Sequence, residues 1–294
     1  MKLSSWIAAI RPQTLAAAIA PVVIGTAMAF GDGLFHGPSA VMALLAALCI
    51  QIGTNLANDY FDFKKGADTS ERKGPVRVTQ AGLIAPRTVL FAAIVFFGLA
   101  ALSSIYLIHR AGICILIIAA TSIVSGILYT AGPMPLGYLG LGEVFVLIFF
   151  GPVAVAGTYF TQALEINGAV ILAGLGPGLL SSAVLAVNNL RDMETDRKAG
   201  KRTLAVRFGR DFARNEYLFC IMAAVLVPLA VLLIASDHQG VAAASLAGFW
   251  AIPCIRDVMT SLDGAILNAT LARTGRLLFF YSALFSAGWI LWSR

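Results

Sequence analysis

Two segments rich in aspartate and asparagine hold the side chains of this sequence that are best suited to chemistry. The first segment contains Asn55, Asn58, Asp59 and Asp62, and then Asp68. At about 100° per residue, Asn55, Asp59 and Asp62 fall within roughly 60° of one another on a helix, and Asn58 shares a face with Asp62. Gly66 can end this helix and let Asp68 fold back toward it.

The second segment lies much later in the chain and has the same character. It contains Asn188, Asn189, Arg191, Asp192 and Asp196. On a helix, Asn189, Asp192 and Asp196 share one face. Both segments are followed by a basic stretch that contains glycine, which suggests two similar halves facing one cavity, although no repeat is detectable residue by residue.

Carboxylate and amide oxygens without histidine or cysteine favour a hard cation such as Mg²⁺, which keeps some water ligands and accepts phosphate oxygens. The predicted metal ligands are Asn58, Asp59, Asp62, Asp68, Asp192 and Asp196, assisted by Asn188 or Asn189. Basic side chains nearby suit phosphate oxygens. The predicted diphosphate ligands are Lys65, Arg72, Arg77, Arg191, Lys201 and Arg202. The pattern therefore predicts a diphosphate held by magnesium.

The alternative is that these side chains are solvated loop charges and helix caps. One such cluster alone would leave that alternative open. Two clusters at membrane helix ends favour a functional site, because ionisable groups in such positions are costly unless they are paired or bind something. The three histidines, His36, His109 and His238, fall in predicted outer loops. A zinc site or acid–base chemistry based on histidine is therefore not expected beside the aspartates.

The elements that position these residues are predicted to be membrane helices. Hydrophobic residues make up 59% of the 294 residues and charged residues only 12%, and the mean hydropathy is +0.85. Since a membrane helix needs about 20 mostly apolar residues, we expect an all-α bundle of about nine spans forming a single domain over residues 1–294. The expected spans are Thr14–Phe30, Ser39–Tyr60, Thr88–Leu107, Gly112–Tyr129, Leu141–Thr161, Ala169–Asn188, Tyr217–Ala235, Gly240–Ile255 and Arg276–Trp292.

The distribution of basic residues orients this bundle. With the N-terminus inside, all of the 21 lysines and arginines except Arg110 and Arg294 fall on the inner side. Inner loops of membrane proteins are enriched in lysine and arginine, so we expect a cytoplasmic N-terminus in a bacterial inner membrane. The same rule explains the net charge of +6 without nucleic-acid binding. Residues 1–30 show no cleavage site, so the first apolar run is expected to be retained as a span.

Two long inner loops, Phe61–Arg87 and Leu190–Glu216, follow the second and sixth expected spans and would form a cytoplasmic cap. The stretch Arg256–Gly275 is typical of an amphipathic helix on the membrane surface. Gly174 and Gly178 have the spacing that allows close helix packing. The four cysteines lie in apolar segments without a CxxC pair, and we expect buried free thiols.

The two segments resemble the motifs of the UbiA superfamily of intramembrane prenyltransferases. Asn58-Asp59-x-x-Asp62 and Asp192-x-x-x-Asp196 match, while Gly66 stands where the general pattern has aspartate and Asp68 follows two residues later. This departure is similar to one branch, the 1,4-dihydroxy-2-naphthoate prenyltransferases of menaquinone synthesis. Further similarity to that branch lies in Arg11-Pro12-x-Thr14, Gly74-Pro75-Val76-Arg77, Tyr129-Thr130 through Glu143, Asn188 through Asp192, and Gly200-Lys201-x-Thr203.

The resemblance implies transfer of a polyprenyl chain from its diphosphate to 1,4-dihydroxy-2-naphthoate. It also implies two Mg²⁺ ions as cofactor. The implied catalytic residues are Asp59, Asp62, Asp192, Asp196 and Tyr129, and the implied substrate-binding residues add Arg11, Asn55, Asn188 and Asn189 to the predicted diphosphate ligands. Two alternatives remain at this point. One is a different aromatic acceptor, such as 4-hydroxybenzoate or homogentisate. The other is a cation-coupled transporter, which would place polar residues near the middle of the bilayer, whereas the acidic residues here cluster at one end.

Overall fold

The structure is a computed structural model that describes residues 2–67 and 74–292. Its helices are α1 (Leu3–Ile10), α2 (Pro12–Gly31), α3 (Gly37–Lys64), α4 (Pro86–Ala111), α5 (Ile113–Leu128), α6 (Gly142–Phe149), α7 (Pro152–Ala163), α8 (Gly168–Lys198), α9 (Leu204–Phe208), α10 (Arg210–Leu232), the 3₁₀ helix η1 (Gln239–Leu246), α11 (Ala247–Thr260) and α12 (Gly264–Leu291). The prediction of an all-α protein is confirmed for the described residues.

In the described parts of the chain, eight helical stretches are long and apolar enough to cross a membrane. Two of them are composite, because α6 continues into α7 and η1 continues into α11. The expected span Gly112–Tyr129 corresponds to α5, which is shorter, with 16 residues. Large apolar side chains such as Phe91, Leu102 and Ile117 are exposed on the outside of the bundle, as lipid-facing positions require. The chain is a multi-pass integral membrane protein.

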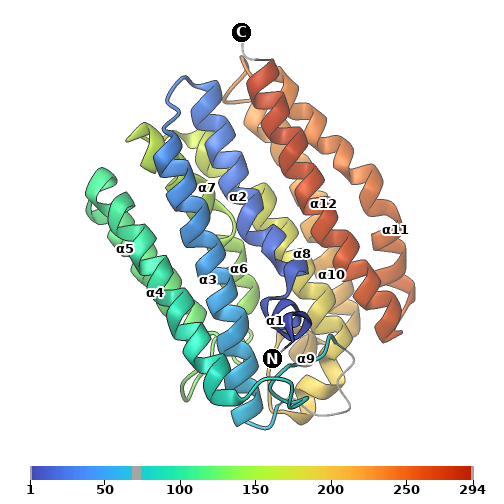
Figure 1. Cartoon of the computed structure of the whole chain (residues 1–294). Coiled ribbons are helices and arrows are strands. Elements are labelled where there is room, and N and C mark those ends of the chain that lie inside the picture. The colour runs from blue at the N-terminus through green and yellow to red at the C-terminus, as the bar shows by residue number, and fades with distance from the viewer. Residues whose placement is uncertain (1, 68–73, 293–294) are drawn as a thin grey trace.

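The helices run side by side in one elongated bundle, and most of them begin or end at one of its two opposite ends (Figure 1). We call the end that holds α9 and the ends of α3 and α8 the inner end, and the opposite end the outer end. Helices α3, α4 and α5 lie on one side of the bundle and α10, α11 and α12 on the other, with α2 and α8 between them (Figure 1). The two aspartate segments therefore come from different parts of the bundle and meet at its inner end.

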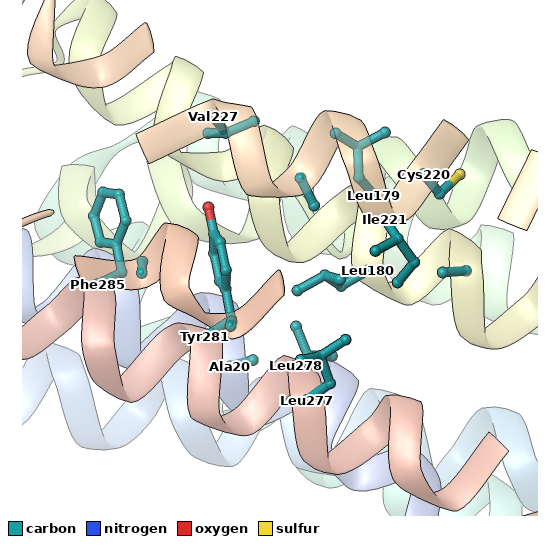
Figure 2. Packing of buried hydrophobic residues seen from close by; sticks show 14 of the residues in the cluster. Ala20, Leu179, Leu180, Cys220, Ile221, Val227, Leu277, Leu278, Tyr281 and Phe285 are labelled. Atoms are coloured by element: carbon teal, nitrogen blue, oxygen red, sulfur yellow. The ribbon is translucent and has the colours of Figure 1, made fainter. Parts of the chain in front are cut away.

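The main apolar core packs α2, α8, α10 and α12 against one another. Leu180, Ile221, Leu278, Tyr281 and Phe285 are fully buried in it, and Figure 2 shows the side chains of α8, α10 and α12 meeting there. Because lipid tails are as apolar as these side chains, close packing rather than the hydrophobic effect holds such helices together.

Small residues allow the closest approach in the bundle, where the break between α6 and α7 rests on α8. A Cβ atom at Gly174 would lie 2.5 Å from the Cα of Pro152, and one at Gly178 would lie 2.5 Å from the backbone oxygen of Leu147. Both positions therefore require glycine, and the packing role expected from their spacing is confirmed. This contact fixes α6 and α7 against the helix that carries the second aspartate segment.

A polar cluster joins three helices at the outer end. The carboxylate of Asp32, at the end of α2, accepts hydrogen bonds from the indole nitrogen of Trp289 on α12 at 2.9 Å and from the hydroxyl of Tyr159 on α7 at 2.7 Å. His238 is buried beside this cluster and stacks on Trp289. The histidine is thus far from the inner end, as expected from the sequence.

Three expectations about the elements need correction. Helix α8 continues to Lys198, so the second aspartate segment is helical and the expected loop Leu190–Glu216 is mostly the end of α8, α9 and the start of α10. Arg256–Gly275 is not one surface helix, because α11 ends at Thr260 and α12 begins at Gly264. The side chain of Asp263 accepts hydrogen bonds from the backbone of Ala265 and Ile266 and so begins a new helix there. Of the four free cysteines, Cys220 and Cys254 are buried, whereas Cys114 is exposed and Cys49 is half-buried.

Candidate active site

Asp62, at the inner end of α3, is the centre of the polar site. Its side chain is buried and has three partners from distant parts of the chain. The guanidinium of Arg77 lies 3.1 Å from Oδ2, the ammonium of Lys201 lies 3.4 Å from the same oxygen, and the hydroxyl of Tyr138 donates to Oδ1 at 2.8 Å. A buried carboxylate requires such partners.

Asp59 has a different position, although it lies on nearly the same helix face. Its Oδ2 accepts a hydrogen bond from the backbone N–H of Val78 at 3.2 Å, and its Oδ1 accepts one from Thr79 at 3.0 Å. Asp59 is buried and does not line the cavity described below. The carboxylate therefore holds the segment that carries Arg77. Because both its oxygens face the protein backbone and it does not line the cavity, Asp59 is a weaker candidate for metal binding and catalysis than Asp62.

The second segment lines the same cavity from α8. Asn188, Asn189, Asp192 and Asp196 all face it, as the helical spacing requires. Asn189 donates to the carboxylate of Glu143 at 2.6 Å, so α6 fixes the orientation of its amide. Sequence reasoning did not include Glu143 in the site.

Arg191 points away from the cavity and orients its neighbours. It forms two hydrogen bonds to the carboxylate of Asp192, at 2.8 and 2.6 Å, and others to the side-chain oxygens of Asn188 and Asn268 at 2.7 Å. Its side chain is almost fully buried and is absent from the cavity wall. Arg191 therefore positions Asp192 and Asn188 and is a weaker candidate for diphosphate binding than Arg77 and Lys201, which line the cavity.

Lys201 joins the two aspartate segments. Its ammonium lies 3.4 Å from Asp62 and 3.7 Å from Asp196, and it also lies over the ring of Tyr138 at 4.9 Å from the centroid. Gly200, with φ of +74°, makes the turn that directs the chain back from the end of α8. Both segments line one cavity, as expected, and Lys201 lies between them.

Lys65 and Arg202 do not reach the cavity wall. Lys65 donates to the backbone oxygens of Thr130 and Gly132, at 2.7 and 3.0 Å, and its ammonium also lies over the ring of Tyr138 at 4.8 Å from the centroid. Burial lowers the pKa of Lys65 below its ordinary value, and the charge of Asp62 opposes this shift. Arg202 is exposed. Both are therefore weaker candidates for diphosphate binding than Arg77 and Lys201.

Asn55 and Arg11 are brought together at the corner between α1 and α2. The amide of Asn55 donates to the backbone oxygen of Ile10 at 2.8 Å and to the hydroxyl of Thr14 at 2.9 Å. Arg11 adopts the left-handed conformation at this corner, with φ of 55°, and lines the cavity together with Asn55. Such backbone strain in a residue other than glycine needs support from its surroundings, and Asn55 provides it.

The connection between α5 and α6 supplies site residues that sequence reasoning left unassigned. Tyr129, which was expected, lines the cavity, and so do Thr130 and Tyr138. The hydroxyl of Thr130 donates to the side-chain oxygen of Asn58 at 2.8 Å, which fixes the amide of Asn58. The signal was present in the sequence as a stretch rich in glycine and proline, but it did not indicate which side chains would point inward.

These residues surround the inner end of one cavity of about 390 Å³. Along α3 its wall extends from Asp62 to Ala43, a distance of about 28 Å at the rise of an α-helix. Away from the aspartates the wall is mostly apolar. It is formed there by Val22, Ala43, Ala46, Leu107, Ile115, Ile118, Phe149 and Val153. The cavity thus combines a charged inner end with a long apolar interior.

The residues at the inner end fit a magnesium–diphosphate complex better than an ion held by protein alone. Among the described residues, no three His, Cys, Asp or Glu side chains converge as a metal cluster. Asp62, Asp192 and Asp196 nevertheless face one cavity together with the amides of Asn58, Asn188 and Asn189, and Mg²⁺ accepts one or two carboxylates plus waters and phosphate oxygens. Asp68 and Arg72, which were also expected in the site, lie outside the described residues.

Comparison with known proteins places the chain in one family. Residues 18–265 match the model of the UbiA prenyltransferase family. The chain is 38% identical to a 1,4-dihydroxy-2-naphthoate octaprenyltransferase of Escherichia coli, over 98% of this chain and 95% of that protein. It is 40% identical to a protein of the same name from Mycobacterium tuberculosis, over 94% and 97% of the two chains.

Two solved structures share the fold. The structure of a UbiA homolog from Archaeoglobus fulgidus bound to DMAPP and Mg²⁺ has a TM-score of 0.61 at 16% identity, covering 96% of this chain and 99% of that one. The apo structure of a UbiA homolog from Aeropyrum pernix has a TM-score of 0.66 at 14% identity, covering 97% and 98%. From its motifs, its cavity and these relatives, the chain belongs to the UbiA prenyltransferase family.

Proposed function

We propose that the chain transfers a polyprenyl group from polyprenyl diphosphate to 1,4-dihydroxy-2-naphthoate in menaquinone biosynthesis. The observation that carries this proposal is the meeting of Asp62 and Asp196 at Lys201, at the charged end of a long apolar cavity. The charged end suits a diphosphate and the apolar length suits an isoprenoid tail. The names of the relatives that align over nearly the whole chain support the naphthoate acceptor.

The reaction balances without a redox partner. The allylic C–O bond of the donor breaks and diphosphate leaves with the bonding electrons. A ring carbon of the acceptor forms the new C–C bond, and the carboxylate leaves as CO₂. The products are demethylmenaquinol, diphosphate and CO₂.

Asp62, Asp192 and Asp196 would hold the metal with help from the amides of Asn58 and Asn188, and we propose two Mg²⁺ ions. Bound Mg²⁺ supplies charge that stabilises the leaving diphosphate. Arg77 and Lys201 contribute cations at the same end of the cavity, and such groups act strongly where water is excluded. Asn189, held by Glu143, completes the wall beside Asp192.

The rest of the cavity protects the reactive carbon from water. Tyr129 and Phe149 line it, and their ring faces suit an allylic cation. The apolar wall keeps the tail apart from solvent and favours attack by the acceptor ring rather than by water. Arg11, on the wall at the corner of α1 and α2, is a partner for the carboxylate of the acceptor.

The protein is proposed to be a single domain over residues 1–294 in the bacterial inner membrane, with the N-terminus and the site on the cytoplasmic side. The positive-inside rule supports this orientation, since basic residues gather at the inner end. In this orientation the charged diphosphate lies at the cytoplasmic face and the tail extends toward the centre of the bilayer.

The test is an assay with one polyprenyl diphosphate, Mg²⁺ and a panel of acceptors. We expect product with 1,4-dihydroxy-2-naphthoate and little or none with 4-hydroxybenzoate or homogentisate. Asp62→Ala and Asp192→Ala should each abolish transfer while the folded protein is still extracted in detergent. Asp211→Ala is a matched control, because that carboxylate is 92% exposed. Transfer by both site variants at the rate of the wild type would overturn the metal assignment, and a preference for another acceptor would overturn the naphthoate.

A further inference from the structure

Among the described residues, one that lines the cavity carries a buried hydroxyl without a hydrogen-bond partner. Within residues 2–67 and 74–292, the buried hydroxyls without a partner belong to Thr79, Ser181, Tyr281 and Ser286. Only Ser181 among these lines the cavity, and it is 3% exposed. A buried hydroxyl without a partner costs free energy, so its position on the cavity wall indicates a ligand that supplies one.

Ser181 is also unusual among the hydroxyls of this bundle. Ser104, Ser282 and Thr274 each donate to the backbone oxygen four residues earlier in their own helix, which is the usual arrangement for such residues in membrane helices. Ser181 makes no such bond among the described residues. Its hydroxyl therefore lacks the partner within its own helix that the other three hydroxyls have.

Helices α2, α8 and α12 contact one another and together form part of the cavity wall, which we call the arm. The arm is lined by Arg11, Thr14 and Ala17 from the start of α2, by Ser181 and Asn188 from α8, and by Leu271, Gly275 and Leu278 from α12. Gly275 lets α12 pack closely on the start of α2, because a Cβ atom there would lie only 3.3 Å from the backbone oxygen of Gln13. Leu278 also packs in the main core beside Leu180 (Figure 2), so this part of the wall is firmly packed.

The chemistry of this arm differs from that of the rest of the cavity. Arg11 contributes a cation to its wall and Ser181 a hydroxyl, while Ala17, Leu271 and Leu278 contribute apolar surface. Ser181 and Asn188 are seven residues apart on one face of α8, or about 10 Å. An isoprenoid tail is a hydrocarbon and can neither pair with a cation nor hydrogen-bond to a hydroxyl. A flat aromatic carboxylate that also bears a hydroxyl group can pair with both.

We propose that this arm binds the aromatic acceptor and that Ser181 makes the hydrogen bond to a ring hydroxyl remote from the carboxylate. The inference rests on the proposed function and names residues of its acceptor site. Arg11 binds the carboxylate and Ser181 recognises the hydroxyl at the far side of the ring. The acceptor thereby lies beside Asn188, next to the charged end where the donor's reactive carbon is held.

The experiment compares Ser181→Ala with Ser282→Ala in the full-length protein. Ser282 is equally buried and on α12, but its hydroxyl donates to Leu278 within its own helix and it does not line the cavity. Loss of one buried hydrogen bond to a ligand corresponds to about a tenfold loss of affinity. We expect Ser181→Ala to raise KM for 1,4-dihydroxy-2-naphthoate about tenfold, with KM for the polyprenyl diphosphate unchanged, and Ser282→Ala to change neither.

An acceptor analogue separates recognition from a structural effect. 1-Hydroxy-2-naphthoate lacks the remote hydroxyl, and its inhibition constant against the natural acceptor can be measured in both proteins. The wild type should bind it about tenfold more weakly than the dihydroxy compound, and Ser181→Ala should bind the two equally. A variant that keeps the wild-type preference, or that raises both substrate KM values alike, would overturn the role of Ser181 while the proposed function stands. A wild type that transfers no prenyl group to the dihydroxy acceptor would overturn both.

Discussion

The guanidinium of Arg77 lies 3.1 Å from the carboxylate of Asp62, and both side chains are more than nine-tenths buried. The pair joins the end of α3 to the segment that follows it, and the backbone of that segment is held by Asp59. Asp59 and Asp62 are only one helical turn apart, yet one fixes the segment and the other faces the substrate cavity. The inner site is therefore built from α3 together with the loop that it holds.

Arg77→Ala should destabilise the protein and lower its activity. Removing one partner of a buried ion pair costs about 3 kcal/mol or more, because the remaining charge is left buried. We expect a clear fall in the melting temperature in detergent and a loss of prenyl transfer. Arg256→Ala, which removes an exposed arginine of the same predicted side, should change neither. Equal melting temperatures for both variants would contradict the buried pair.

Asp59→Asn should act through the loop and not through the metal. The amide keeps one acceptor oxygen but places an NH₂ group against a backbone N–H, so about 1–3 kcal/mol of stability is lost. The residual activity should show the same dependence on Mg²⁺ concentration as the wild type, whereas Asp62→Asn should shift that dependence to higher concentration. A shift of equal size in Asp59→Asn would restore this residue to the metal site.

Lys201→Ala should separate metal binding from diphosphate binding. The ammonium lies between Asp62 and Asp196, and its removal leaves two carboxylates at one cavity end with less positive charge. We expect tighter Mg²⁺ binding by calorimetry without substrate, and a KM for polyprenyl diphosphate raised about tenfold because a charge-assisted contact is lost. Weaker Mg²⁺ binding instead would mean that Lys201 does not compete with the metal.

Gly174→Val should disrupt the packing of α6 and α7 on α8. Any Cβ atom at this position would lie 2.5 Å from the Cα of Pro152, so the helices must move apart and carry Glu143 away from Asn189. We expect a lower yield of folded protein and a lower melting temperature. Gly98→Ala provides the control, because a Cβ atom there meets nothing within 4 Å and alanine favours helix by about 1 kcal/mol.

Cysteine labelling should establish the orientation of the bundle. In a Cys114→Ser background, Glu165→Cys places a thiol on the exposed connection between α7 and α8, and Lys198→Cys places one at the exposed inner end of α8. An impermeant maleimide should label the first from outside intact spheroplasts and the second only in inverted vesicles. The reverse pattern would place the active site outside the cell.

The sequence by itself determined the class of the fold and most of the chemistry of the site. Long apolar runs can only be helices in a bilayer, because the backbone must satisfy its hydrogen bonds within each segment. The aspartates and asparagines repeat at helical spacing, so their common faces on α3 and α8 follow from the geometry of a helix. The lengths of α8 and α12 were underestimated because helices can continue beyond the apolar run, as Asp263 capping α12 illustrates.

Only the tertiary structure decided which polar side chains face the substrate cavity and which hold the protein together. Asp59, Arg191 and Lys65 have the same residue types as Asp62, Arg77 and Lys201, but their partners are the loop backbone, Asp192 and the turn after α5. Those partners are up to 67 residues away in the chain, and spacing along a single helix carries no information about them. The role of Ser181 is hidden for the same reason, since only the packing of α2, α8 and α12 places this serine of an apolar run on a cavity wall without a hydrogen-bond partner among the described residues.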